Sequence, residues 1–75
     1  MNDKKNVWVV PSAGNWAIKR ENSDETIAVV KTQLEAYKEA RVIAIEAKVE
    51  LIVQGRNGQI RFKNSFGNHP RGSKG

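Results

Sequence analysis

The side chains that could do chemistry in this chain are few, and most of them are cations. The 75 residues include one histidine and no cysteine, and the 13 lysines and arginines outnumber the eight acidic residues. Without cysteine there is no disulfide, thiolate nucleophile or cysteine zinc site, and a lone histidine cannot supply the ligands of a metal site. A general base needs a partner and a pocket, and His69 has no carboxylate near it in sequence. The sequence therefore predicts no enzyme, no metal, no cofactor and no small-molecule substrate.

The excess of cations favours partners that carry negative charge. The net charge is +5, which suits either a polyanion or an acidic protein surface, although such a charge also simply keeps a small protein soluble. Basic side chains interleaved with an aromatic ring are typical of single-stranded nucleic-acid binding, since cations neutralise phosphates and a ring stacks on a base. The residues that could form such a surface are Trp8, Lys19, Arg56, Arg61 and Lys63.

These side chains must be held by short strands, and hairpin signals place them. Residues 6–10 and 16–20 are rich in β-formers around a turn composition at residues 12–15, which predicts a first hairpin. Asn57-Gly58 lies between residues 51–54 and 59–63 and predicts a second hairpin with a type I′ turn. The letters of Gly55-Arg56-Asn57-Gly58 also match the phosphate-clamping loop of KH domains, but that loop joins two helices, so the turn interpretation is favoured.

A helix is predicted between the hairpins. Thr32 and Glu35 have the spacing of a capping box, and good helix formers follow to about Lys48. One stripe of this helix consists of Ala36, Tyr37, Ala40, Ile43, Ala44 and Ala47. Because alanine lets a helix approach a sheet closely, the sheet must supply the larger core residues. The candidates are Val7, Val9, Trp16, Ile18, Leu51, Val53, Ile60 and Phe62.

The predicted fold class is α+β, a single domain over residues 1–66 with the order β-β-α-β-β. Two hairpins and one helix most simply form an antiparallel sheet of four strands with the helix packed on one face, and residues 26–30 are either a short fifth strand or a lead-in to the helix. Residues 67–75 read as a flexible, basic, glycine-rich tail. If Ile60 and Phe62 face the helix, strand alternation places Lys19, Arg61 and Lys63 on the open face together with Trp8.

Several short motifs follow one another along nearly the whole chain. They are Val7-x-Val9-Val10-Pro11, Gly14-x-Trp16-Ala17-Ile18-Lys19, Thr32-Gln33-x-Glu35-Ala36, Ala40-Arg41-x-Ile43-Ala44, Gly55-Arg56-Asn57-Gly58-x-Ile60-Arg61 and Phe66-Gly67-Asn68-x-Pro70. In order and spacing they resemble the small bacterial domain-of-unknown-function family 2188. The resemblance implies a compact α+β domain of bacterial or phage origin, and it implies no reaction or ligand.

The predicted function is a non-enzymatic interaction module. Leu34, Val42 and Ile45 fall on the outer side of the predicted helix and could contact a second copy or another protein. Protein contact or self-association, including a homodimer, is the first interpretation, and nucleic-acid binding through the basic sheet face is the alternative. The apolar runs are too short for a membrane span, and no apolar segment of signal-peptide length follows the N-terminus, so a cytoplasmic protein without membrane contact is expected.

Overall fold

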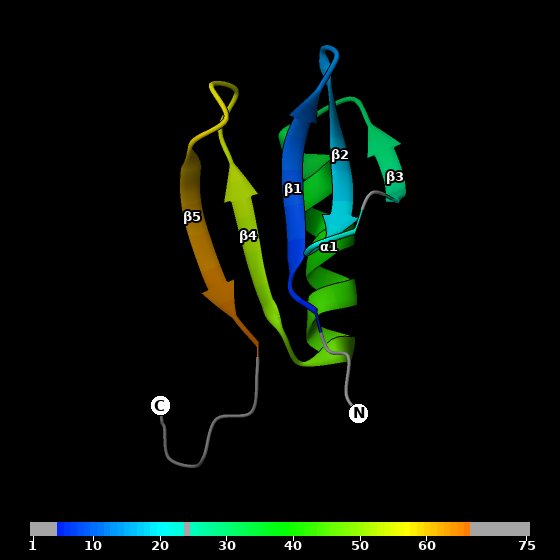
Figure 1. Cartoon of the computed structure of the whole chain (residues 1–75), viewed down its shortest axis with the longest axis vertical. Helices are drawn as coiled ribbons and strands as arrows, with labels where there is room; N and C mark the ends of the chain where they lie inside the picture. The colour runs from blue at the N-terminus through cyan, green and yellow to red at the C-terminus, as the bar shows by residue number, and fades with distance from the viewer. Residues whose placement is uncertain (1–4, 24, 67–75) are drawn as a thin grey trace.

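The structure is a computed structural model that describes residues 5–23 and 25–66. Its elements run in the order β1 (Val7–Ser12), β2 (Asn15–Arg20), β3 (Thr26–Val30), α1 (Gln33–Ala47), β4 (Glu50–Gln54) and β5 (Ile60–Ser65). The strands form one sheet in the order β3-β2-β1-β4-β5, and α1 covers one of its faces (Figure 1). The predicted α+β class with a single covering helix is confirmed. The predicted tail of residues 67–75 lies outside the described residues.

The sheet is mixed and five-stranded rather than purely antiparallel and four-stranded. β1 pairs antiparallel with β2, and β4 with β5, but β1 and β4 are parallel neighbours over Val7–Val9 and Leu51–Val53. The parallel pairing of β1 and β4 follows from β3, which is a strand antiparallel to β2 and therefore runs parallel to β1. The chain therefore enters α1 from a strand that runs in the direction of β1, and the crossover helix returns it to the sheet in that same direction.

The helix is fixed at both ends by local chemistry. Thr32 caps its start, and the Thr32 hydroxyl accepts a hydrogen bond from the Glu35 amide at 3.1 Å, as the sequence predicts. The helix ends at Lys48, whose amide donates to the carbonyls of Ala44 and Ile45. Lys48 adopts a left-handed conformation (φ 59°, ψ 50°), which turns the chain so that the next amide, that of Val49, reaches the Ala44 carbonyl at 3.1 Å.

The core lies between the alanine stripe and the covered side of the sheet. Ala36, Ala40 and Ala44 are fully buried, and the remaining stripe residues Tyr37, Ile43 and Ala47 pack around them. From the strands, Val7, Val9, Trp16, Ile18, Leu51 and Val53 are buried as expected. The prediction was wrong for Ile60 and Phe62, which are exposed. Ile60 lies on the face of the sheet opposite α1. Phe62 lies on the helix side, but β5 is at the edge of the sheet, beyond the part that α1 covers (Figure 1).

The second hairpin forms at the predicted place with a different turn. Only Gly58 of the Asn57-Gly58 pair has a positive φ (84°), whereas a type I′ turn needs both. The Gly58 amide bonds to the Gly55 carbonyl at 2.9 Å, and the Gly55 amide bonds to the Gln59 carbonyl at 2.8 Å. Asn57 contributes through its side chain instead, because its Oδ1 accepts from the Gln59 amide at 3.0 Å.

Candidate functional site

The face of the sheet opposite α1 carries a continuous row of four side chains from four strands. Trp8 lies across from Lys19 on β2 and beside Ile52 on β4, and Ile52 lies across from Lys63 on β5. Trp8 alternates with the buried Val7 and Val9, which point toward the helix, so the indole is on the open face. The structure thus brings together three of the predicted nucleic-acid residues, Trp8, Lys19 and Lys63, with Ile52 between them.

A second row on the same face is almost entirely apolar. Val10 lies across from Ala17, and Ala17 lies across from Val29 on β3. Val29 is 53% exposed, whereas Ala17 and Ile52 are buried by their neighbours although no helix covers them. We call this surface the open sheet face. Its residues are Trp8, Val10, Ala17, Lys19, Val29, Glu50, Ile52, Gln54, Ile60 and Lys63.

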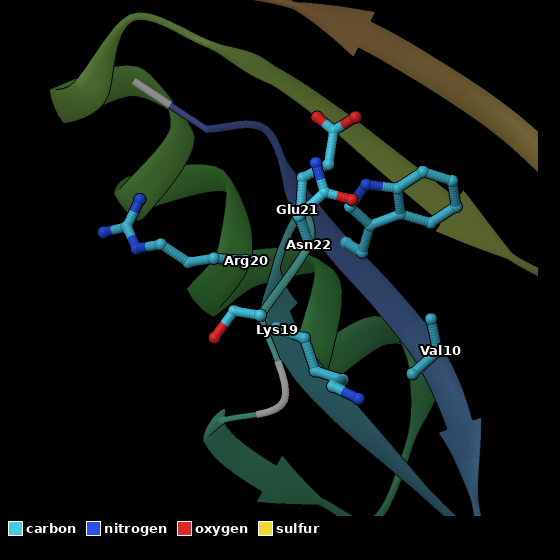
Figure 2. Close-up of a pocket in the computed structure, with 7 residues that line it drawn as sticks. Val10, Lys19, Arg20, Glu21 and Asn22 are labelled. Atoms are coloured by element: carbon cyan, nitrogen blue, oxygen red, sulfur yellow. The ribbon is translucent and has the colours of Figure 1, made fainter. Parts of the chain in front are cut away.

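Trp8 lines a hollow of about 270 Å³ at one end of the open sheet face. Figure 2 shows Val10 and Lys19 on one side of this hollow and Glu21 and Asn22 together on the other, at the loop that follows β2. Within the described part of the chain, the indole nitrogen of Trp8 is the one buried side-chain nitrogen or oxygen without a hydrogen-bond partner. A buried donor without an acceptor costs free energy, about 1–3 kcal/mol.

The structure moves Arg61 off the open sheet face. A β-bulge in β5 pairs Val53 with Phe62 and Gln54 with Ile60, which leaves Arg61 as the extra residue. Ile60 therefore joins the open face. Arg61 turns to the helix side, where its Cδ lies 3.9 Å from the place that a Cβ on Gly55 would occupy. The expectation that Arg61 shares a face with Lys19 and Lys63 is corrected, because it assumed an unbroken alternation.

Arg56 also lies on the helix side. Its guanidinium carbon is 5.5 Å from the centroid of the Trp16 ring, a cation–π distance, and Trp16 points toward the helix. Arg56 and Arg61 line a common hollow of about 250 Å³, and Lys31 joins them there from the segment between β3 and α1. The five predicted nucleic-acid residues are thus divided between two surfaces on opposite sides of the sheet.

The predicted protein-contact residues of the helix lie where the sequence places them. Leu34, Val42 and Ile45 are all exposed. Lys38 and Arg41 fall between them on the same side of the helix, so the apolar residues are separated by charges. The open sheet face is the more continuous apolar surface of the two.

A comparison with known protein families matches residues 7–66 to DUF2188, described as an uncharacterized protein conserved in bacteria. The chain belongs to this family. No curated protein and no solved structure matched it. The match covers all six elements of this DUF2188 chain, and it contains both the open sheet face and the hollow that Arg56 and Arg61 share.

Two further properties of this DUF2188 chain bear on its chemistry. Among residues 5–23 and 25–66, no group of three or more histidine, cysteine or acidic side chains is placed to hold a metal ion. The one helix found in the described residues is neither long nor apolar enough to cross a membrane.

The sequence reading missed four residues that the structure makes prominent. Val29 and Ile52 belong to the open sheet face. Glu50 lies on the same face at the start of β4, because it alternates with the buried Leu51. The available signal was the composition of residues 26–30 and 50–54, which are apolar at nearly every position rather than at every second one. Lys31 was missed because only the fold brings it to Arg56 and Arg61.

Proposed function

We propose that this DUF2188 chain is a non-enzymatic interaction module that associates with a second copy of itself through the open sheet face. The observation that carries the proposal is that β3 and the centre of β4 are apolar on both sides while the helix covers one side. Strands that are buried on both faces read as nearly continuous apolar runs, and half-exposed strands alternate with polar residues. β3 (Thr26–Val30) and the centre of β4 (Leu51, Ile52, Val53) follow the first pattern.

The charges on the open sheet face suit a second copy. Lys19 and Lys63 lie at opposite ends of the row that contains Trp8. Glu50 lies on the same face, and Glu21 lines the hollow beside Trp8. A two-fold contact places the same patch of each copy against the other, so a patch that contains both signs can pair with itself.

The size of the face sets the expected strength. With strands about 4.8 Å apart and residues rising about 3.3 Å, five short strands offer a face on the order of 400 Å². Two such faces together bury on the order of 800 Å², which is below the roughly 1,200–2,000 Å² of stable specific interfaces and in the size range of weak, transient contacts. We therefore expect a weak dimer that dissociates at micromolar concentrations.

The test is sedimentation velocity over a concentration range from about ten to several hundred micromolar. Val29→Glu places a charge on the open sheet face, and Val42→Glu places the same charge on the outer side of α1. The two valines are equally exposed, at 53% each, which makes them a matched pair. Circular dichroism checks that both variants fold, and Ile60→Glu provides a second variant on the sheet face from another strand.

The expected result is a weight-average mass that rises with concentration for the native chain and for Val42→Glu, but stays at the monomer value for Val29→Glu and Ile60→Glu. A native chain that remains a monomer at every concentration overturns the proposal. Dissociation by Val42→Glu with no effect of Val29→Glu also overturns it, because the contact would then lie on the residues Leu34, Val42 and Ile45.

Single-stranded nucleic acid is the second candidate for the same face. It is supported by the row Lys19, Trp8, Ile52, Lys63, since a ring with a cation on each side along the row can stack on a base while the cations contact two phosphates. With two phosphate contacts, the logarithm of the binding constant should fall with the logarithm of the salt concentration with a slope of roughly −1.4. Fluorescence anisotropy with a labelled oligonucleotide measures this slope. Unchanged affinity in a Lys19→Glu/Lys63→Glu variant excludes this candidate.

A further inference from the structure

Three cations from separate parts of the chain converge on one hollow on the helix side of the sheet. Lys31 precedes the helix, Arg56 lies in the turn between β4 and β5, and Arg61 is the bulge residue of β5. The hollow has a volume of about 250 Å³, and its lining is completed by Trp16, Thr32 and Gln33. No carboxylate belongs to this lining as far as the structure describes the chain. Three like charges around one space repel one another unless an anion occupies it.

Each arginine is held in place by a specific feature of the fold. The guanidinium of Arg56 lies over the Trp16 ring at 5.5 Å, a contact that uses the flat face of the group and leaves its N–H donors at the edge. The bulge turns Arg61 to the same side, where its stem lies beside Gly55 and its side chain lines the hollow with Arg56. Both groups are thereby brought to the hollow before any ligand arrives.

The other polar side chains of the hollow also stabilise the fold. The Thr32 hydroxyl accepts from the Glu35 amide. The Gln33 side-chain amide donates to the Gln54 carbonyl at 3.0 Å and so ties the start of α1 to the end of β4. The positive charge of the hollow comes from Lys31, Arg56 and Arg61, while the Thr32 hydroxyl keeps its O–H free to donate and Gln33 ties the two walls together.

A larger hollow of about 470 Å³ adjoins the same two arginines. Its lining consists of Gly55, Arg56, Asn57, Gln59, Ile60 and Arg61. The smaller hollow is below the size of a pocket that encloses a whole small molecule, roughly 300–1,000 Å³. It suits a single compact anionic group, while the rest of the ligand lies over the larger hollow.

We infer that Lys31, Arg56 and Arg61 form a binding site for a phosphate group. Arginine presents its donors in a planar fork that matches phosphate oxygens, and lysine adds a point charge. The phosphate belongs either to a small phosphate ester or to the backbone of a nucleic-acid strand, and the shared chemistry is the tetrahedral oxyanion. The three cations lie on the opposite side of the sheet from the open sheet face, which shares only Ile60 with the larger hollow, so the site does not depend on self-association.

The experiment is an NMR titration that follows backbone amides and arginine Nε–H groups at constant ionic strength. The probes are inorganic phosphate, pyrophosphate and an eight-nucleotide thymidine strand. We expect saturable shifts at the Nε–H groups of Arg56 and Arg61 and at the amides of Lys31 and its neighbours. Arg56→Gln/Arg61→Gln should weaken binding at least tenfold. The control, Lys5→Gln/Lys38→Gln, removes the same charge from exposed positions elsewhere and should leave binding within about twofold.

The outcomes distinguish the two sources of the phosphate, and they include results that would overturn the inference. Tighter binding of the strand than of pyrophosphate assigns the site to a nucleic-acid backbone, and equal or weaker binding assigns it to a small phosphate ester. The inference is overturned if none of the probes gives saturable shifts at Arg56 and Arg61. It is also overturned if the control variant loses as much affinity as the arginine variant, because the binding would then follow net charge alone. Sedimentation of the arginine variant reports independently on the dimer.

Discussion

The guanidinium carbon of Arg56 lies 5.5 Å from the centre of the Trp16 ring, although the two residues are far apart in the chain. Trp16 is 3% exposed, so the arginine closes the edge of the core where the β4–β5 turn approaches β2. The contact is specific to the fold and explains why an exposed cation from a turn points to the helix side.

Replacing Arg56 with alanine should lower the free energy of unfolding by about 0.5–1 kcal/mol, because an exposed cation–π contact contributes that much. Urea unfolding followed by tryptophan fluorescence measures the change. Arg20→Ala removes an exposed cation at the end of β2 and is the control, for which we expect little change. Equal losses in the two variants would mean that the ring contact contributes nothing beyond charge.

The same substitution should destabilise the protein far more at one than at the other of two isoleucines that the sequence assigns to one core. Ile18→Ala removes a fully buried side chain and should cost about 2–5 kcal/mol. Ile60→Ala removes a side chain that is 53% exposed at the sheet edge and should cost well under about 1 kcal/mol. Urea unfolding at low micromolar concentration keeps self-association out of the comparison. A large loss at Ile60 would contradict the bulge that places it on the open sheet face.

The alanine stripe of α1 should not tolerate larger side chains. Ala40 is fully buried against the sheet, so Ala40→Leu forces the helix away from the strands and should cost about 1–3 kcal/mol or more. Glu39→Leu introduces the same side chain at the neighbouring exposed position, where no strand opposes it. We expect its thermal unfolding midpoint to stay close to that of the native chain. A stabilised Ala40→Leu variant would mean that the helix is not closely packed on the sheet.

Glycine should stabilise one end of the helix and destabilise its middle. Lys48 adopts a left-handed conformation with φ 59°, which costs a residue with a Cβ about 1–2 kcal/mol. Lys48→Gly should therefore raise the free energy of unfolding by up to about 1 kcal/mol. Lys38→Gly, at an exposed position inside the helix, should lower it by a similar amount. Differential scanning calorimetry distinguishes the two signs, and a destabilised Lys48→Gly variant would show that the lysine side chain itself has a role.

Local signals predicted the helix and both hairpins because the groups involved are neighbours in sequence. The Thr32 cap, the alanine stripe and the Gly58 turn need no information from the rest of the chain. The sequence alone could not predict the parallel pairing of β1 and β4. A helix that crosses the sheet can place two apolar strands side by side in either direction.

The candidate site was less predictable than the fold because a single extra residue changes it. Alternation assigns Trp8, Lys19 and Lys63 correctly, because the β1–β2 pairing is unbroken and Lys63 follows the bulge in β5. The bulge at Arg61 reverses the faces that alternation assigns to Ile60 and Arg61. The residue type at this position does not predict a bulge. The contact of Arg56 with Trp16 depends on both hairpins and appears only in the assembled sheet.

The parallel pairing of β1 with β4 has a consequence for the chain during translation. One edge of β1 meets β2 soon after both leave the ribosome, but its other edge has no neighbour until β4 emerges. The Glu50 amide donates a hydrogen bond to the Asn6 side chain across 44 positions, so about that many residues must be synthesised before β4 can pair with β1. At about 5–20 residues per second, the nascent chain exposes an apolar strand edge for a few seconds. Chains on neighbouring ribosomes of one messenger are most open to pairing with each other in that interval.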